Sequence, residues 1–181
     1  MTTFTVEVKD QQVLDLLQKL QNRMGNLQPA LQAIGDDIVE RAKQRFGTST
    51  APDGTPWAPL SATTLGMFEG GLGKGYRKKD GNLNKRGQAA VGSRKILIGD
   101  SGDLSRQIFA RATTAQVTVL SSPVYAAMHQ FGGITAANSM IPGKRIPARP
   151  FMPVDSDGNL DPTEQRLVLE SLQEFLTSDL G

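Results

Sequence analysis

The single histidine, His129, is the side chain best suited to acid–base chemistry in this chain of 181 residues. An imidazole titrates near neutral pH, so it could activate a hydroxyl nucleophile or bind a metal. The sequence has no cysteine for it to activate and no second histidine to share a zinc ion. No nucleophile-elbow motif is present, although a Ser-His-Asp arrangement stays open at this point. We interpret His129 as a structural or interface residue rather than a catalytic one.

A second candidate is the stretch Gly-Asp-Ser-Gly-Asp at residues 99–103. Glycines beside carboxylates are typical of loops that bind calcium or phosphate. A calcium loop ends in a glutamate, and a phosphate loop ends in Gly-Lys-Ser or Gly-Lys-Thr, and neither ending occurs here. We therefore predict a turn before Leu104, and we predict no metal and no cofactor.

The third candidate is a basic, glycine-rich insert at residues 69–95, with few apolar residues. Such a composition buries too little surface to offset its ordering entropy, so we predict a mobile segment that orders on binding. Its cations could contact nucleic-acid phosphates or an acidic protein surface. The candidate contacts are Arg77, Lys78, Lys79, Lys85 and Arg86. Tyr76 is the one aromatic residue among these cations that could stack on a base, and no helix suited to reading DNA is apparent. We therefore favour a solvated loop over specific DNA binding.

Composition limits the class of protein. The length and a hydrophobic content of 38% fit one domain over residues 1–181. No run approaches the roughly 20 apolar residues of a bilayer helix, so no membrane contact is expected. The amino terminus lacks the basic start and apolar centre of a secretory signal, which predicts a cytosolic protein. The absence of cysteine excludes disulfides, and a net charge of +2 says little by itself.

The apolar spacing predicts an α+β fold. Phe4, Val6 and Val8 alternate with polar residues, as in a strand with one buried face. Apolar stripes at helical spacing predict helices over 13–24, over 29–46 and from Asp161 through Leu176. Two further strands are predicted over 108–112 and 116–120. We expect helices packed on a small antiparallel sheet, with long flexible loops.

Two segments are predicted to position the candidate residues as one packed unit. A short helix from Pro123, ended by Gly132 and Gly133, places Tyr125, Met128, His129 and Phe131 at helical spacings. The other segment, residues 145–152, contains Pro147 and Pro150, which favour extended backbone. We call residues 145–152 the proline ribbon.

A rigid loop precedes these segments at residues 52–60. It combines an Asp-Gly turn with three prolines and the only tryptophan, Trp57, which we interpret as a local anchor. Ser61 is a candidate cap for a short helix after it.

Four motifs follow one another in the order Pro-Asp-Gly-Thr-Pro-Trp-Ala-Pro-Leu (52–60), Ile-Leu-Ile with Ser-Gly-Asp-Leu (96–104), Tyr-Ala-Ala-Met-His-Gln-Phe-Gly-Gly (125–133) and Ile-Pro-Ala-Arg-Pro-Phe (146–151). In this order and spacing the chain resembles the phage virion morphogenesis family. That family includes tail completion proteins of temperate contractile-tailed phages and their Mu-like relatives. The basic insert carries none of the resemblance.

The resemblance implies a structural protein without catalytic activity. It would act late in virion assembly, in tail completion and head-to-tail joining, first in the host cytoplasm and then in the virion. The implied partners are tail or head-connector proteins and other copies of the chain in a ring. The expected interface or structural anchors are Trp57, Tyr125, His129, Phe131, Arg149 and Phe151. The alternatives are a nucleic-acid-binding accessory protein that uses residues 69–95 and a small hydrolase that uses His129.

Overall fold

The computed structural model describes residues 15, 18–19, 21–22, 24–99, 101–139 and 141–178. The strand predicted at residues 4–8 lies outside this part of the chain, as does much of the helix predicted over 13–24, of which the described residues are helical. Two compact units divide the chain. The first comprises residues up to Val39, Phe109–Leu120 and residues from Pro162 on; the second comprises Glu40–Ile108 and Ser121–Asp161. No helix in the described ranges has the length and apolarity to cross a membrane.

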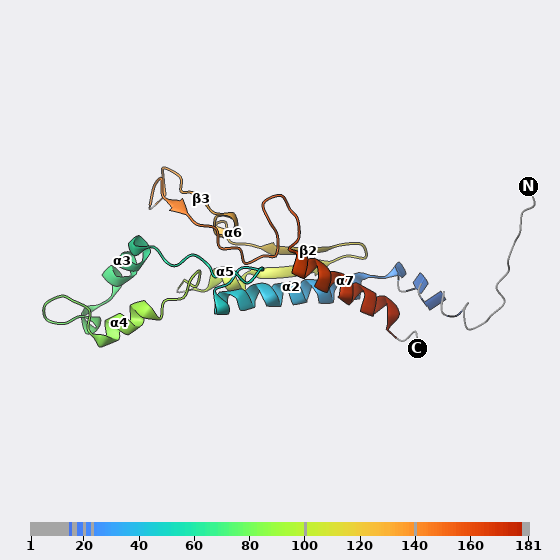
Figure 1. The fold of residues 1–181 in the computed structure, drawn as a ribbon, viewed down its shortest axis with the longest axis horizontal. Helices are drawn as coiled ribbons and strands as arrows, with labels where there is room; N and C mark the ends of the chain where they lie inside the picture. Colours follow the sequence, from blue (N-terminus) through green and yellow to red (C-terminus); the bar gives the residue numbers. More distant parts are fainter. Residues whose placement is uncertain are drawn as a thin grey trace, which may run out of the picture. The chain divides into compact units, whose positions relative to one another are not determined.

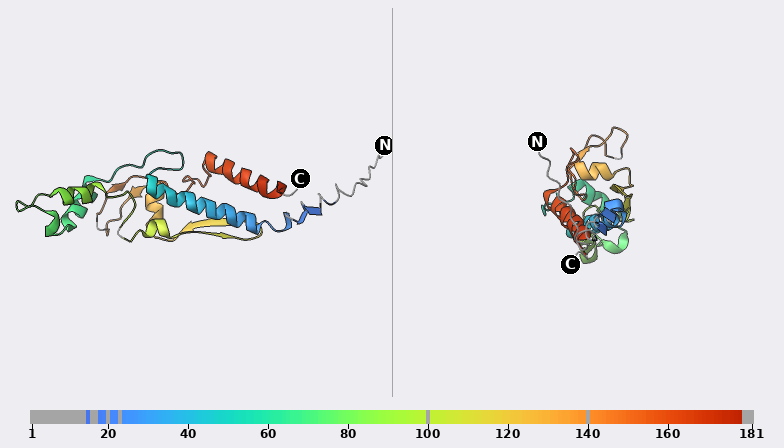
Figure 2. Two further views of the ribbon diagram at one scale, coloured as in Figure 1. Left: turned by 90° about the horizontal axis from the view of Figure 1, so that it is seen from below. Right: turned by 90° about the vertical axis from the view of Figure 1, so that its right-hand side faces the viewer.

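In the first unit a helix packs on a β-hairpin. Helix α2 (Gln28–Thr48) confirms the helix predicted over 29–46, and its residues up to Val39 belong to this unit. The hairpin is formed by β1 (Ile108–Ala112) and β2 (Val117–Ser121). In Figure 2 (left), α2 lies between the hairpin and helix α7 (Pro162–Thr177). Ala30, Ile34 and Ile38 are buried at helical spacing along one side of α2, and Ala30 and Ile34 lie against Phe175 and neighbouring residues of α7.

Glycine at position 35 permits the close approach of α2 to the hairpin. A Cβ atom there would lie 2.6 Å from Val117 Cγ2 and 2.8 Å from Ala110 Cβ. Polar side chains also fix the register between the helix and the hairpin. Gln32 Oε1 accepts a hydrogen bond from the backbone N–H of Ala112 at 3.0 Å, and Gln28 Nε2 donates to the carbonyl of the same residue.

Helix α7 begins where the sequence predicts. Asp161 precedes Pro162 at the first helical position, where the missing N–H of proline costs nothing. Glu164 lies in the first turn and is only 2% exposed. A carboxylate in the first turn is favoured by the partial positive charge of the helix N-terminus.

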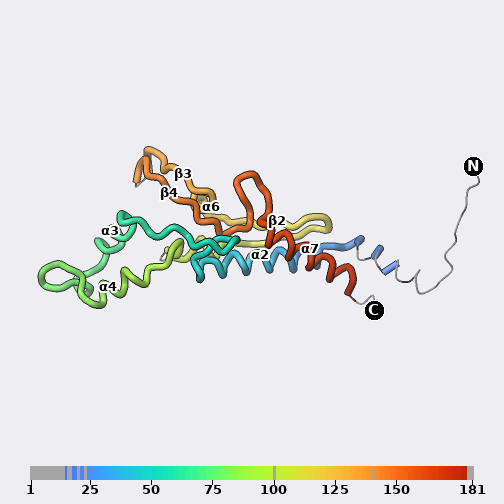
Figure 3. Tube along the Cα trace, viewed as in Figure 1, coloured from blue at the N-terminus to red at the C-terminus, as the bar shows by residue number. Residues whose placement is uncertain are grey.

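The second unit contains short helices and a small hairpin. Its elements after the end of α2 are α3 (Ala62–Gly71), η1 (Lys74–Tyr76), α4 (Lys85–Gly92), α5 (Asp103–Arg106), α6 (Ala126–Phe131), β3 (Gly133–Ile134) and β4 (Arg145–Ile146). Figure 3 shows β3 and β4 side by side next to α6, and Gly133 pairs with Ile146 in antiparallel register. The helices and two small antiparallel sheets in Figure 1 confirm the α+β class.

Three aromatic rings form the core of the second unit. The Phe46 ring centroid lies 5.5 Å from that of Trp57, edge to face, and 5.3 Å from that of Phe151. All three side chains are at most 5% exposed. Edge-to-face and tilted pairs of this kind add to the stabilisation from apolar burial. The core thus joins the end of α2, the loop at residues 52–60 that contains Trp57 (the tryptophan loop) and the proline ribbon.

The basic insert at 69–95 contains more regular structure than its sequence suggests. Helix α4 is capped by Asn84, whose side chain accepts a hydrogen bond from the Gly87 N–H at 3.0 Å. Gly87 packs against Tyr76, because a Cβ there would lie 2.4 Å from the Tyr76 carbonyl oxygen. Gly87 is also the one buried residue of the insert. Local capping therefore supplies the order that apolar burial does not, and the mobility of the insert stays a prediction.

Candidate interaction site

Helix α6 is short because of the residues on either side of it. Pro123 lies in a turn, where its carbonyl accepts a hydrogen bond from the Ala126 N–H at 2.9 Å, so the helix begins at Ala126 rather than at the proline. Gly132 ends it with φ of 73°. A Cβ on Gly132 would lie 2.8 Å from the Ala148 nitrogen and 2.9 Å from the Ile146 oxygen. Glycine is therefore required for the proline ribbon to cross the end of α6.

The side-chain amide of Gln130 holds the far end of the proline ribbon. Its Oε1 accepts hydrogen bonds from the N–H groups of Phe151 and Met152, both at 3.0 Å. Its Nε2 donates to the carbonyls of Met152 at 3.0 Å and Val154 at 2.9 Å. Gln130 is 4% exposed, so its amide replaces the hydrogen bonds that water would make with this backbone.

Two further side chains fix the same stretch from the other side of the core. Trp57 Nε1 donates to the Pro150 carbonyl at 2.9 Å, and Arg45 Nη1 donates to the Phe151 carbonyl at 2.8 Å. The carbonyls of Pro150 and Phe151 are thus satisfied by side chains from the tryptophan loop and α2. The prediction that the α6 segment and the ribbon form one packed unit is confirmed by these contacts and those of Gln130.

Arg149 links three segments from a buried position. Its backbone N–H donates to the His129 carbonyl at 2.7 Å, and its side chain donates from Nε to the Ala58 carbonyl at 2.8 Å and from Nη2 to the Pro59 carbonyl at 2.9 Å. The residue is 6% exposed, and burial lowers the pKa of its guanidinium. In the part of the chain that the structure describes, no carboxylate forms an ion pair with it.

His129 lies half-buried beside Arg149. Burial, and then the positive charge of Arg149, lower the pKa of His129 from its ordinary value of 6.5. Its ring meets the Tyr125 ring edge to face, with centroids 5.9 Å apart, and its buried Nδ1 atom has no hydrogen-bond partner within the described ranges. An imidazole in this setting is neutral near pH 7.

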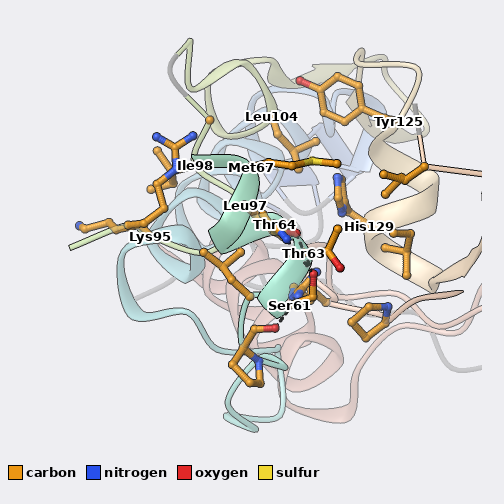
Figure 4. Close-up of a pocket in the computed structure, with 18 of the residues that line it drawn as sticks. Ser61, Thr63, Thr64, Met67, Lys95, Leu97, Ile98, Leu104, Tyr125 and His129 are labelled. Atoms are coloured by element: carbon orange, nitrogen blue, oxygen red, sulfur yellow. Dashed lines mark hydrogen bonds between the residues drawn. The ribbon is translucent and has the colours of Figure 1, made fainter. Parts of the chain in front are cut away.

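A cavity of about 600 Å³ lies beside these residues, within the second unit. Figure 4 shows Met67 and Thr64 of α3 facing His129 of α6 and Tyr125, the residue just before α6, across it. The rest of the described lining is mostly of three chemical kinds, to which Pro59, Gly99, Pro147 and one carboxylate, Asp103, are added. The three kinds are the aliphatic Leu60, Leu97, Ile98, Leu104, Ile141 and Ile146, the hydroxyls of Ser61, Thr63 and Ser101, and the cations Arg94, Lys95, Lys144, Arg145 and Arg149.

The expected anchors do not all occupy the same environment. Trp57, Arg149 and Phe151 are buried around the ribbon, whereas Tyr125 is 44% exposed and Phe131 is 47% exposed. Their roles as contacts to partners stay predictions.

The candidate anion contacts of the insert lie elsewhere, and none of them lines the cavity. Arg77 donates to the carbonyls of Glu69 and Gly81, and Arg86 lies 4.8 Å from the centroid of the Tyr76 ring. Lys78, Lys79 and Lys85 are exposed. Two of the five cations are thus engaged within the insert, while the lysines present their charge to solvent.

Sequence reasoning missed Gln130, and it also missed the cavity. A glutamine inside the apolar Met-His-Gln-Phe stretch is the available signal, since a polar side chain on a buried helix face needs partners. The partners themselves are up to 24 residues away. The described residues contain no group of three His, Asp or Glu side chains placed to bind a metal.

Comparison with protein families identifies a match over most of the chain. The model of the phage virion morphogenesis family matches residues 8–176. No curated protein and no solved structure matches the chain. The matched range includes the tryptophan loop, α6, the proline ribbon and the residues around the cavity.

Proposed function

Since the chain belongs to the phage virion morphogenesis family and so has a role in phage virion assembly, we propose a specific step for it. It acts late in assembly, where it completes the tail and joins the tail stably to the head. The observation that carries this proposal is the extent of the match, which includes all four motifs. A match restricted to one motif would support only a shared local structure.

The geometry of the second unit supports a joining role. The long loop between β3 and β4 is fixed at both ends, because these two strands pair with each other. Gly132, at the end of α6, lets the proline ribbon pass close to that helix. The tryptophan loop is fixed by Trp57 and by the Arg149 side chain. Loops with rigid roots lose less entropy when they bind than loops that are free at both ends. This arrangement suits a protein that holds others together.

In this proposal the loops at 47–60, 69–95 and 133–145 contact tail or head-connector proteins and neighbouring copies of the chain. A closed ring of identical subunits is the simplest assembly that suits an axial junction, since one heterologous interface repeated by rotation builds it. The protein would be assembled in the host cytoplasm and retained in the virion. It would perform no catalysis.

Electron microscopy of phage lysates tests the proposal. Without this protein, we expect DNA-filled heads and separate or incomplete tails, with infectious titre lost and then restored by supplying the wild-type chain. Intact, infectious virions in its absence would contradict the proposal. A block before DNA packaging would instead place the protein earlier in assembly.

A second candidate function is suggested by the exposed lysines of the insert. Lys78 and Lys79 lie next to each other in a turn and project from a segment with little acidic charge. Such a cluster is suited to phosphate contacts that are independent of DNA sequence. The insert would then bind DNA as an accessory activity, which salt-dependent binding can test.

A further inference from the structure

The cavity beside α6 has an excess of positive charge. Five of its lining residues are Arg or Lys, and Asp103 is the one carboxylate among the described lining residues. Lys95, Lys144 and Arg145 form no ion pair with any described residue. Charges gathered at a concave surface attract an oppositely charged partner more strongly than the same charges spread over an open surface.

Two buried groups at the cavity have unused hydrogen-bonding capacity. Arg149 is more than nine-tenths buried, and its two side-chain hydrogen bonds go to neutral carbonyls, so its charge lacks a counter-ion within the described residues. A guanidinium has five N–H donors, and these two bonds use only part of them. His129 Nδ1 is buried and has no partner among the described residues. Buried groups of this kind are normally satisfied, so the Arg149 N–H groups point to a missing acceptor, which also satisfies His129 Nδ1 in the tautomer that carries its proton there.

The rest of the lining is aliphatic. Leu60, Leu97 and Leu104 line the cavity with Met67, which is 54% exposed. Leu97 has φ of 59°, a strained backbone conformation for a non-glycine residue, and such conformations are concentrated at binding sites. A volume of about 600 Å³ is within the range of ligand pockets and far larger than one inorganic anion. A ligand that fits must therefore combine a negative charge with a large apolar group.

A protein segment fits this lining better than a nucleic acid. Nucleic-acid strands lie in open basic grooves where several aromatic rings stack on the bases. Among the described lining residues, Tyr125 is the one aromatic residue apart from His129, and the other apolar lining residues are mostly aliphatic. Aspartate or glutamate beside leucine or phenylalanine supplies the carboxylate and the apolar group from adjacent residues of one chain.

We propose that this cavity is the docking site for an acidic segment of another virion protein, whose carboxylate pairs with Arg149 and His129 while its apolar side chain packs against Leu60, Met67 and Leu104. The inference rests on the proposed function only in assigning the partner to the virion. The cations at the cavity rim, Lys95, Lys144 and Arg145, contact further carboxylates of the same segment.

Binding of a synthetic peptide to the full-length protein tests the site directly. The probe is a capped, fluorescently labelled peptide of alternating Asp and Leu residues. One twin peptide replaces each Asp by Asn, and another replaces each Leu by Ser. We expect the Asp–Leu peptide to bind at least tenfold more tightly than either twin, measured by fluorescence anisotropy. Equal binding of the Asn twin would overturn the role of the carboxylate, and equal binding of the Ser twin would overturn the apolar part.

A matched pair of variants locates the binding. Lys144→Glu with Arg145→Glu changes the charge at the cavity, and Lys78→Glu with Lys79→Glu makes the same change in net charge within the insert. All four side chains are exposed, so both variants are expected to keep the wild-type unfolding temperature. We expect the first variant to weaken peptide binding at least tenfold and the second by less than twofold. Equal weakening by both, or tighter binding of a DNA oligonucleotide than of the peptide, would overturn the proposal.

Complementation separates this inference from the proposed function. If the cavity variant loses peptide binding and also fails to restore tail joining, both stand. If it loses peptide binding but restores infectious virions, docking at the cavity is not used in assembly, and the inference fails while the proposed function stands. If removal of the protein leaves virions intact although the peptide binds as expected, the proposed function fails while the acidic-segment site stands.

Discussion

The Oε1 atom of Gln130 accepts a hydrogen bond from the backbone N–H of Phe151 at 3.0 Å, although 21 residues separate them in the chain. This bond connects α6 to the proline ribbon at the point where the Phe151 ring enters the aromatic core. Pro147 and Pro150 cannot donate backbone hydrogen bonds, so the ribbon pairs with β3 at Arg145–Ile146 but is poorly suited to strand pairing beyond that point. The glutamine amide supplies both donors and acceptors in place of such a strand.

Replacement of Gln130 by methionine therefore removes four hydrogen bonds and leaves buried backbone groups without partners. We expect the free energy of unfolding to fall by about 3 kcal/mol or more, since each buried unsatisfied group costs about 1–3 kcal/mol. Urea unfolding followed by circular dichroism measures the change. Gln116→Met, at an exposed position, is the control and should change stability by less than about 0.5 kcal/mol. Similar losses in both variants would contradict the bridging role.

Gly132→Ala tests the close approach of the ribbon to the end of α6. The new methyl group would meet backbone atoms of Ile146 and Ala148, at a residue whose φ is 73°. We expect a loss of about 3 kcal/mol or more, because conformational strain and overpacking act together. Gly143→Ala separates the two effects, since φ there is 64° and nothing lies within 4 Å of the new Cβ. The free energy of unfolding of Gly143→Ala should fall by only about 1 kcal/mol. If the two variants lost the same amount, steric contact at Gly132 would be unimportant.

Trp57 allows the ring and its hydrogen bond to be tested separately. Trp57→Phe keeps an aromatic ring beside Phe46 but leaves the Pro150 carbonyl without its donor, at a cost of about 1–3 kcal/mol. Trp57→Ala also creates a cavity in the core and should cost about 3–5 kcal/mol. Thermal unfolding of both variants distinguishes the contributions. If Trp57→Phe were as damaging as Trp57→Ala, the hydrogen bond rather than ring packing would dominate.

The sequence contained enough information for the elements that depend on local patterns. The apolar stripe of α2, the bend between β1 and β2 and the start of α7 at Asp161 follow from residues within a few positions of one another. The Ser61 cap was also predictable, and the structure confirms it through the hydrogen bond from the Thr64 N–H.

The long-range contacts were not predictable in this way. The cavity gathers cations from residues 94–95 and from residues 144–149, and neither stretch alone indicates a pocket. The hydrogen bonds of Gln130 and Arg149 depend on which segments meet in three dimensions, which a single sequence does not specify. In the basic insert, low apolar content favoured an irregular loop, whereas the Asn84 cap and the Gly87 packing produce α4. Local polar contacts there outweighed composition.

The lowered pKa of His129 predicts a pH dependence of stability. The unfolded chain takes up a proton at this residue near its ordinary pKa of 6.5, at higher pH than the folded chain does. Stability is therefore fully present above about pH 6.5 and falls as the pH decreases toward the folded pKa. Asp53 and Asp155 also have lowered pKa values, caused mainly by hydrogen bonds with Thr55 and Asn159, but their effect lies near and below their ordinary value of 3.8. The two ranges are thus separate.

Urea unfolding at several pH values between about pH 7 and pH 5 should show a decrease in stability for the wild type, and His129→Gln should remove most of that decrease. A wild-type profile that is flat over this range would contradict burial of a neutral imidazole. The acidic peptide provides a second readout: a carboxylate beside His129 raises its pKa, so bound peptide should move the imidazole titration, followed by NMR, to higher pH.

The exposed lysines of the insert decide whether DNA contact accompanies assembly. If Lys78, Lys79 and Lys85 bind phosphates, replacing all three by glutamine should weaken binding to a double-stranded DNA oligonucleotide. Each phosphate contact releases about one counterion, so the slope of log affinity against log salt concentration should become shallower by about three. Arg77→Gln is a poor test, since its guanidinium donates to the carbonyls of Glu69 and Gly81 and its loss would disturb the insert itself. The control variant makes an equal change in charge outside the insert, by replacing Lys43, Lys144 and Arg145 with glutamine. DNA affinity that falls equally in both triple variants would indicate general electrostatic attraction, and affinity unchanged by the insert variant would exclude these lysines as the contact.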